Sequence, residues 1–428
     1  MSANPSLAAF TAASLRVGCL GFGGPAGQIA LMHRIFVTEK RWVDEARYLY
    51  ALNYCMLLPG PEAQQLATYI GWLLHGVRGG LIAGTLFVLP GALIVFALSW
   101  LYVAHGQAPL VMALFYGVKA AVLGFVVDAL ARIGRRALKS WLEAAIAAAA
   151  LLALYLFGAP FPLVILASLA LGLLAARGLS GAPLAPDPAA RAQPSAARAL
   201  RAGAVWLALW LAPLAIVLAV FGEGHVLAQV GLLFSQLALI SFGGAYALLA
   251  YLQQQAVDGY GWLTQAQMID GLGLAETTPG PLVLVNQYVG FLAGWREGGF
   301  ALAAAGAALA TWCTMAPSFA WIFAGAPFAE RLRRSAYAQA ALRAVTAAAL
   351  GIIAALALWF AQHVIFRENT VFSAPWGRSL DLPLAAAFDP IAALIAVFSA
   401  TALIRFKANA ALVVLAAAVA GWVASLAI

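Results

Sequence analysis

Residues 51–72 read ALNYCMLLPGPEAQQLATYIGW, an apolar run interrupted by proline, glycine and proline at positions 59–61. The same tripeptide recurs 220 positions later inside AETTPGPLVLVNQYVGF, residues 275–291. Proline ends a helix because it lacks an N–H and disfavours helix in the residue before it. Each run is therefore predicted to form two half-helices. The two PGP motifs consist of Pro59, Gly60, Pro61, Pro279, Gly280 and Pro281.

A phenylalanine followed by two glycines precedes each PGP motif at the same distance. Trp42 and Trp262 keep this spacing as well. Motifs that recur together without a gap indicate that the chain contains two copies of one unit. The two FGG motifs consist of Phe22, Gly23, Gly24, Phe242, Gly243 and Gly244.

The composition identifies an integral membrane protein. The 428 residues are 64% hydrophobic and only 9% charged, whereas charged residues make up about a quarter of a soluble domain. The net charge of +8 comes from short basic clusters between apolar runs, which is typical of cytoplasmic membrane loops. We therefore expect a lipid bilayer as the environment and no nucleic acid as a partner. The three cysteines are far apart and indicate neither a disulfide framework nor a metal site.

The apolar runs predict an all-α fold of about 13 membrane segments, given about 30 Å of hydrocarbon to cross. The runs 45–76 and 263–294 each carry a PGP motif in the middle, so each should be a broken helix. About six segments precede the run at 205–221 and about six follow it. The continuous runs are 7–33, 79–104, 109–131, 141–157, 161–176, 205–221, 226–252, 298–325, 338–366, 389–404 and 410–427.

These segments predict three parts: a first repeat at 1–176, a linker with one connecting span at 177–225, and a second repeat at 226–428. The linker is rich in Pro, Ala and Arg and should be cytoplasmic. One extra crossing between the repeats inverts the second relative to the first. The N-terminus is then inside and the C-terminus outside.

Loop charge supports the inversion. In copy one the basic cluster follows the fourth segment, but in copy two it follows the third, and the next loop, 367–388, is neutral. The stretch 34–47 argues the other way, because its net charge is +1 (four basic and three acidic residues) and the inverted topology places it outside. The two clusters are Arg132, Arg135, Arg136 and Lys139 in copy one, and Arg331, Arg333 and Arg334 in copy two.

The PGP motifs predict a binding site. The second proline of each motif suits the first position of a helix, so a helix N-terminus begins at Pro61 and at Pro281. Free N–H groups and the positive end of the dipole bind anions there. Such backbone survives in a membrane only beside protein or a water-filled cavity. The alternative is a kink that packs against neighbouring helices.

The glycines around the FGG motifs have two interpretations as well. Gly21, Gly23 and Gly24 permit close backbone approach or conformations forbidden to other residues. The alternative is a small-residue packing face, which is common in membrane helices. Glycine alone does not decide between them.

Charged residues at membrane depth are costly and usually functional. Arg16 is placed to add a fixed positive charge to the site, whereas its counterpart Gln236 is uncharged; alternatively, Arg16 snorkels to the interface. Lys119 should face the protein interior. Glu62 follows the first PGP motif and suits a capping role.

Glu276 precedes the second PGP motif and is the candidate for proton coupling, because a buried carboxylate can take up a proton near neutrality. No metal-ligand spacing of histidines and no catalytic Ser-His-Asp set is present. Further hydrogen-bond donors around the breaks are Asn53, Gln64, Gln65, Asn286 and Gln287. Besides Arg16 and the two motif pairs with Gly21, the candidate substrate-binding residues are Glu62, Gln64, Gln65, Thr277, Thr278 and Asn286.

At this point the motifs resemble the chromate ion transporter family in its long, two-domain form. GFGGPAGQIALM and SFGGAYALL join the two PGP sequences in this resemblance, which covers nearly the whole chain. It implies export of chromate across the bacterial inner membrane, driven by protons or membrane potential, with chromate resistance as the result. It implies no cofactor, and a homodimer is compatible with it. Only the FGG and PGP positions carry over, and Leu282 stands where copy one has Glu62.

Two other functions stay open. Sulfate has the same charge and shape as chromate, so a carrier of sulfate or another tetrahedral oxyanion is the first alternative. A membrane-embedded enzyme acting on a lipid-linked substrate would need a carboxylate pair, a metal cluster or a nucleophile with its base, none of which is evident in the sequence. The favoured mechanism places a tetrahedral dianion near the midplane, between two half-helix N-termini of inverted repeats that rock to alternate access.

Overall fold

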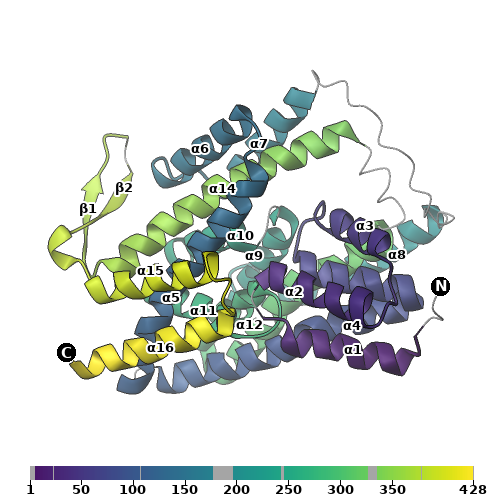
Figure 1. Ribbon diagram of the computed structural model, residues 1–428, viewed down its shortest axis with the longest axis horizontal. Coiled ribbons are helices and arrows are strands. Elements are labelled where there is room, and N and C mark those ends of the chain that lie inside the picture. The colour runs from purple at the N-terminus through teal and green to yellow at the C-terminus, as the bar shows by residue number, and fades with distance from the viewer. Residues whose placement is uncertain are drawn as a thin grey trace. The chain divides into compact units, whose positions relative to one another are not determined.

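The computed structural model describes residues 5–22, 24–106, 108–176, 196–241, 245–325, 335–376 and 378–427, most of which are helical (Figure 1). These residues form two compact units, each built from three stretches of the chain. Unit 1 falls within Met1–Ser99, Arg177–Ala245 and Thr278–Gln339. Unit 2 falls within Trp100–Ala176, Tyr246–Thr277 and Ala340–Ile428. Both units thus take helices from both halves of the chain.

Unit 1 contains the FGG breaks and the PGP motifs. Polar caps set several helix starts: the Ser6 side chain accepts from the Ala9 N–H, and Asp44 accepts from the Arg47 N–H. Helix α12 packs against α8 and α9. The elements of unit 1 are α1 (Leu7–Leu20), α2 (Gly24–His33), the π-helix η1 (Arg34–Glu39), α3 (Glu45–Cys55), α4 (Glu62–His105, as far as Ser99), α8 (Ala196–Phe221), α9 (Val226–Ile240), the 3₁₀ turn η3 (Leu282–Leu284) and α12 (Val285–Gly325).

The predicted breaks at both PGP motifs are confirmed. Helix α3 ends at Cys55 and α4 begins at Glu62, while α11 ends at Thr277 and α12 begins at Val285. Helices α4 and α12 are also sharply bent, around residues 75–76 and 298–299. In α4 the backbone of residue 71 approaches that of residue 79, so the helix folds back on itself directly after the bend.

Unit 2 is organised around α5, which packs against α11, α15 and α16. Small residues allow the close approach: Gly117 lies against the Ala417 carbonyl, and Gly124 lies against Ser399. The elements of unit 2 are α5 (Pro109–Ala137), α6 (Trp141–Tyr155), α7 (Phe161–Ala176), α10 (Ala245–Gln253), the π-helix η2 (Gln254–Gly259), α11 (Gln265–Thr277), α14 (Ala336–Ile365), β1 (Asn369–Ser373), β2 (Ser379–Pro383), the 3₁₀ turn η5 (Ala385–Ala387), α15 (Pro390–Ile404) and α16 (Ala410–Ala427).

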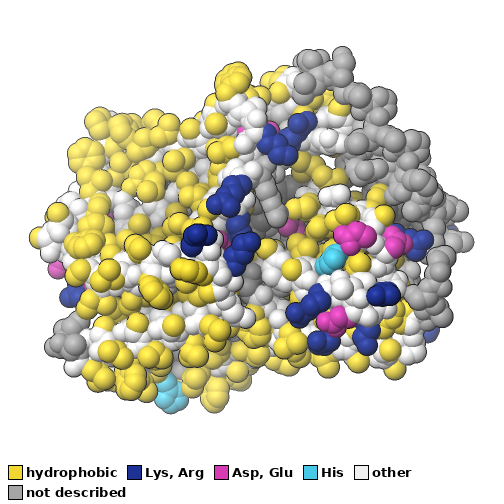
Figure 2. Space-filling model, in the orientation of Figure 1, with side chains coloured by type: hydrophobic (Ala, Val, Ile, Leu, Met, Phe, Trp, Pro, Cys, Tyr) yellow, Lys and Arg dark blue, Asp and Glu magenta, His cyan; other side chains and the backbone are white. Residues whose placement is uncertain are grey.

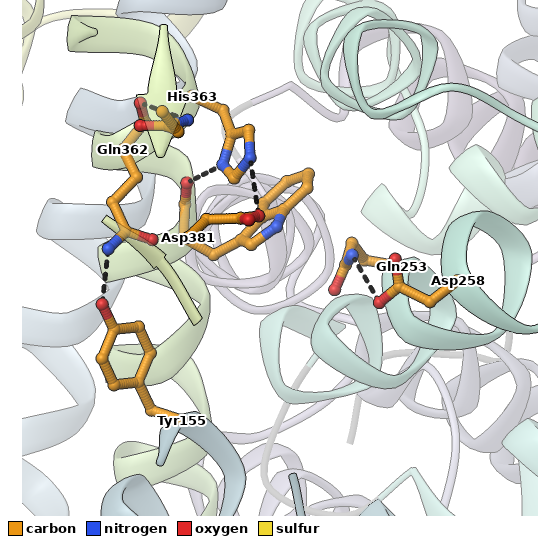
Figure 3. A network of polar contacts seen from close by, with 8 residues as sticks. Tyr155, Gln253, Asp258, Gln362, His363 and Asp381 are labelled. Atoms are coloured by element: carbon orange, nitrogen blue, oxygen red, sulfur yellow. Dashed lines mark hydrogen bonds and ion pairs between the residues drawn. The ribbon is translucent and has the colours of Figure 1, made fainter. Parts of the chain in front are cut away.

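A small β-hairpin departs from the all-α prediction. Strands β1 and β2 pair antiparallel, from Asn369 opposite Pro383 to Ser373 opposite Ser379, within the predicted loop 367–388. An isolated hairpin is marginally stable in water, and this one has side-chain attachments. Asp381 lies 3.7 Å from His363 Nε2, beside a hydrogen bond from Gln362 to Tyr155 (Figure 3).

The helices carry the apolar surface of a membrane protein. Five described helices are long and apolar enough to cross a bilayer, and six shorter apolar helices accompany them. Leu394 and Phe398 of α15 are 69% and 75% exposed, which favours lipid rather than water around them. Figure 2 shows hydrophobic side chains over most of the surface of α15 and α16, whereas charged side chains gather over α1, α2 and α3.

Candidate functional site

Within unit 1 the two PGP motifs make a reciprocal pair of hydrogen bonds. The Gly60 N–H donates to the Ser241 carbonyl at 2.9 Å, and the Gly280 N–H donates to the Gly21 carbonyl at 3.0 Å. Gly21 and Ser241 are the C-cap residues directly after α1 and α9, and they are themselves 220 positions apart. Each PGP motif therefore binds the helix break of the other copy.

The glycine of each PGP motif has a backbone conformation that favours glycine. Its φ angle is +113° at Gly60 and +95° at Gly280. A Cβ at Gly60 would lie 2.9 Å from the Gln65 amide nitrogen, and one at Gly280 would lie 3.3 Å from a methyl group of Leu284. The geometry of both breaks thus depends on glycine.

One side chain holds the second break in place. The Gln28 amide, which is buried, donates to the Gly21 carbonyl at 3.1 Å and to the Gly280 carbonyl at 2.5 Å. It thereby bridges the FGG region of copy one and the PGP motif of copy two. The counterpart in copy two is Leu248, which has no donor. Sequence reasoning missed Gln28, although a glutamine within the apolar run after the FGG motif was a visible signal.

The two half-helices that follow the PGP motifs begin at one small cavity. Its volume is about 20 Å³, which holds about one water molecule and is too small for an anion with four oxygen atoms. In copy one α4 starts directly at Glu62, whereas in copy two the 3₁₀ turn η3 precedes α12. The lining residues are Pro25, Gln28, Gly60, Pro61, Glu62, Ala63, Ser241, Pro281, Leu282 and Val283.

The amide side chains predicted near the breaks lie in unit 1, and their N–H groups donate to other groups of the protein. Gln65 donates to the Pro59 carbonyl at 2.7 Å, Gln64 to the Met315 carbonyl at 3.4 Å, and Asn286 to the Thr314 hydroxyl at 3.0 Å. All three are buried. In this conformation they brace the broken helices, and none of them lines the cavity.

Arg16 is not brought into this cavity. Its side chain is 49% exposed and pairs with Glu39 at 3.0 Å, and it is absent from the cavity lining. Thr278 is buried in unit 1, whereas the Thr277 hydroxyl, in unit 2, donates to the Leu274 carbonyl at 2.7 Å. Phe22 is half-buried beside Gly21, and Gly24 begins α2. Gly23, Phe242, Gly243 and Gly244 lie outside the described residues.

Among the described residues, the buried carboxylates lie in unit 2. Glu276 is buried and accepts a hydrogen bond from the Tyr246 hydroxyl at 2.5 Å. The Lys119 ammonium lies 3.2 Å from the Asp270 carboxylate. Sequence reasoning did not predict this ion pair. Asp128 pairs instead with Arg132, one turn along α5, at 2.9 Å.

The apolar helices, the paired helix breaks and the buried ionisable groups define a class, the multi-pass membrane transporter. The family described as chromate transporter matches residues 8–173 and 228–422 of this chain. The chain belongs to the chromate transporter family.

Curated relatives support this assignment over most of the chain. The chain is 33% identical to the chromate transport protein of Pseudomonas aeruginosa over 415 residues, 95% of this chain and 90% of that protein. It is 32% identical to the probable chromate transport protein of Synechococcus elongatus (82% and 83% covered). It is 30% identical to the chromate transport protein of Cupriavidus metallidurans (82% of each). No solved structure shows a significant match. The protein is thus a transporter, not an enzyme, of the bacterial inner membrane.

Proposed function

We propose that this protein exports chromate across the inner membrane as a secondary active transporter and so confers chromate resistance. The observation that carries the proposal is the reciprocal pair of hydrogen bonds between each PGP motif and the break of the other copy. Both half-helices begin at the cavity beside these bonds, and helix N-termini favour anions. The substrate class comes from the relatives, two of which are named chromate transport protein and one probable chromate transport protein.

The proposed transport cycle uses two inverted repeats. A reciprocal exchange of hydrogen bonds is what a two-fold relation between the copies produces, and inverted repeats of transporters meet at their broken helices. The proposal keeps about 13 membrane segments, with the N-terminus inside and the C-terminus outside. Reporter fusions test it: the loops at 132–140 and 331–335 should report opposite sides, and a cytoplasmic signal from a fusion at Ile428 would contradict the inversion.

The described conformation is closed around the cavity. A volume of about 20 Å³ admits about one water molecule, so chromate enters only when the two breaks move apart. The backbone N–H groups of Ala63 and Val283 then face the anion from the two half-helices. Arg16, which Glu39 holds in this conformation, joins the open site as a fixed charge.

Coupling to protons is assigned to Glu276. Its carboxylate is buried, and the Tyr246 hydroxyl contacts it. Glu276→Gln should abolish the pH dependence of net transport, while chromate still binds and exchanges across the membrane. An unchanged pH profile at full activity would contradict this assignment and would move the proton role to Glu62 or Asp270, or favour drive by membrane potential alone.

The decisive experiment for function is anion uptake by inverted vesicles that contain the purified protein. We expect chromate to accumulate when a membrane potential or a proton gradient is imposed, and empty vesicles serve as the control. Sulfate is tested in parallel, because it is also a tetrahedral dianion. Accumulation of sulfate with no chromate uptake would replace the proposal by a sulfate carrier, and uptake of neither would refute oxyanion transport.

A further inference from the structure

A second cavity lies within unit 2 and is large enough for an oxyanion. Its volume is about 490 Å³, within the range of small-molecule sites. It lies between α5, the end of α14 with the following loop, the start of α15, and α16. The lining residues are Tyr116, Lys119, His363, Val364, Phe366, Arg367, Asp389, Gly421, Ala424 and Ser425.

Two of the basic groups in this lining already have partners. Arg367 pairs with Asp389 at 3.0 Å. Asp389 also accepts hydrogen bonds from the Tyr116 hydroxyl at 2.8 Å and from the Ala392 N–H at 3.1 Å. The carboxylate of Asp389 thus already faces the charge of Arg367. The His363 ring lies between the Trp359 carbonyl, 2.8 Å from Nδ1, and Asp381 (Figure 3).

Lys119 is the remaining cation of the lining. It lies on α5, its side chain is 28% exposed, and its ammonium is 3.2 Å from Asp270 Oδ1. Asp270 is 6% exposed and accepts a hydrogen bond from the Tyr102 hydroxyl at 2.7 Å. Asp270 does not line the cavity, so Lys119 contacts the cavity on one side and a buried carboxylate on the other. Ion pairs within a membrane are costly and mark functional sites.

We propose that Lys119 binds a tetrahedral oxyanion in this cavity and that Asp270 competes with the anion for the same ammonium. When Asp270 is ionised, it neutralises Lys119 and the anion leaves. When Asp270 takes up a proton, the charge of Lys119 is available to the anion. Binding of the anion and of the proton are then linked, and each strengthens the other. This site deepens the proposed function, on which it rests, and adds an anion site to the one at the PGP motifs.

The surroundings of the pair single out Asp270 as the proton-binding group. Lys119 of α5 and Tyr102 of α4 face it, and α16, which also packs against α11, carries no ionisable side chain in residues 410–427. Lys119 shares the cavity lining with Tyr116 of the same helix and with His363, Arg367 and Asp389. Because His363 also lines the cavity, the test includes a His363→Gln variant, in which the pH response should persist.

The test is equilibrium binding of radiolabelled chromate to the purified full-length protein, from mildly acidic to mildly alkaline pH. We expect wild type to show a binding component whose affinity rises as the pH falls. Asp270→Asn should keep the affinity of this component high at every pH, so that at the alkaline end its affinity is about tenfold above that of wild type. Lys119→Gln should weaken the affinity of this component about tenfold or more at every pH. A tenfold change in affinity corresponds to about 1.4 kcal/mol. Lys119→Arg should retain it. Arg405→Gln, on the exposed end of α15, is the matched control.

The outcomes separate the two proposals. A loss of the component in Asp270→Asn equal to that in Lys119→Gln would mean that the pair is merely structural and would overturn the inference. So would an unchanged pH response in both variants, although chromate export would then stand. No chromate binding or transport by wild type would refute the proposed function and this site with it. A misfolded variant cannot mimic the expected gain of affinity in Asp270→Asn, and thermal unfolding checks the fold of Lys119→Gln.

Discussion

Residues 24–55 and 245–277 occupy equivalent places in the two copies and have the same backbone plan. The π-helices η1 and η2 begin 220 positions apart, and each is followed by a helix that ends before a PGP motif. Their side chains differ. The copy-one segment carries exposed ion pairs, such as Arg34 with Glu39, whereas the copy-two segment buries Asp270 and Glu276. Shared glycines and prolines thus preserve the order of the helices, and the buried carboxylates make the two copies chemically unequal.

The largest effect is expected at the glycines that the copies share. Gly280→Ala places a Cβ where φ is +95°, at a cost of about 1–3 kcal/mol, and should abolish chromate transport while the protein remains inserted. Gly60→Ala should do the same. Chromate flux into proteoliposomes measures transport, and thermal unfolding measures the loss of stability. Gly134→Ala is the control, because a Cβ there has ordinary contacts, 3.7 Å or more from Leu350; wild-type flux in Gly280→Ala would show that the break is only a packing kink.

The next effect concerns Gln28, the bridge that copy two lacks. Gln28→Leu installs the residue type found at position 248 and removes this donor from the Gly280 carbonyl, whereas the Gly21 carbonyl still accepts from the Gly280 N–H. An unsatisfied buried carbonyl costs about 1–3 kcal/mol, so we expect a clear loss of thermal stability together with slower transport. Gln229→Leu removes an exposed glutamine hydrogen bond and should cost less than about 1 kcal/mol. Equal losses of thermal stability in Gln28→Leu and Gln229→Leu would show that the Gln28 bridge does not stabilise the break.

Arg16 gives a smaller effect on stability. Arg16→Gln breaks an exposed pair with Glu39 that is worth at most about 1 kcal/mol. If Arg16 joins the open site, chromate flux should fall well below that of Lys139→Gln at equal abundance. Normal flux in both variants would assign Arg16 to the surface alone.

The smallest expected effect is a pH dependence of thermal stability that η2 has and η1 lacks. Asp258 in η2 stands where η1 has Thr38, and partial burial raises the pKa of Asp258. Because a raised folded pKa makes ionisation unfavourable, the group is tolerated at low pH and destabilises the fold as the pH rises through that pKa. Asp258→Asn should therefore raise the melting temperature slightly at neutral pH, and the gain should vanish in acid. A gain that is independent of pH would contradict this explanation.

Local chemistry was predictable from the sequence, and distant pairing was not. The PGP motifs predicted both helix breaks because proline acts on its immediate neighbours. The Gln28 bridge joins residues 252 positions apart, and no periodicity reports such a contact. The same holds for Lys119, whose partner Asp270 lies on a separate helix. The β-hairpin was missed because its strands have five residues each, in a loop of neutral charge.

The central claim is that the anion binds where the two broken helices meet. Its most direct measurement is the position of chromium in the protein soaked with chromate, located by anomalous scattering at the chromium absorption edge. The account predicts a chromium peak beside the PGP motifs, between the N–H groups of Ala63 and Val283, with the cavity widened from about 20 Å³. A peak at the Lys119 cavity with none at the PGP motifs would contradict it.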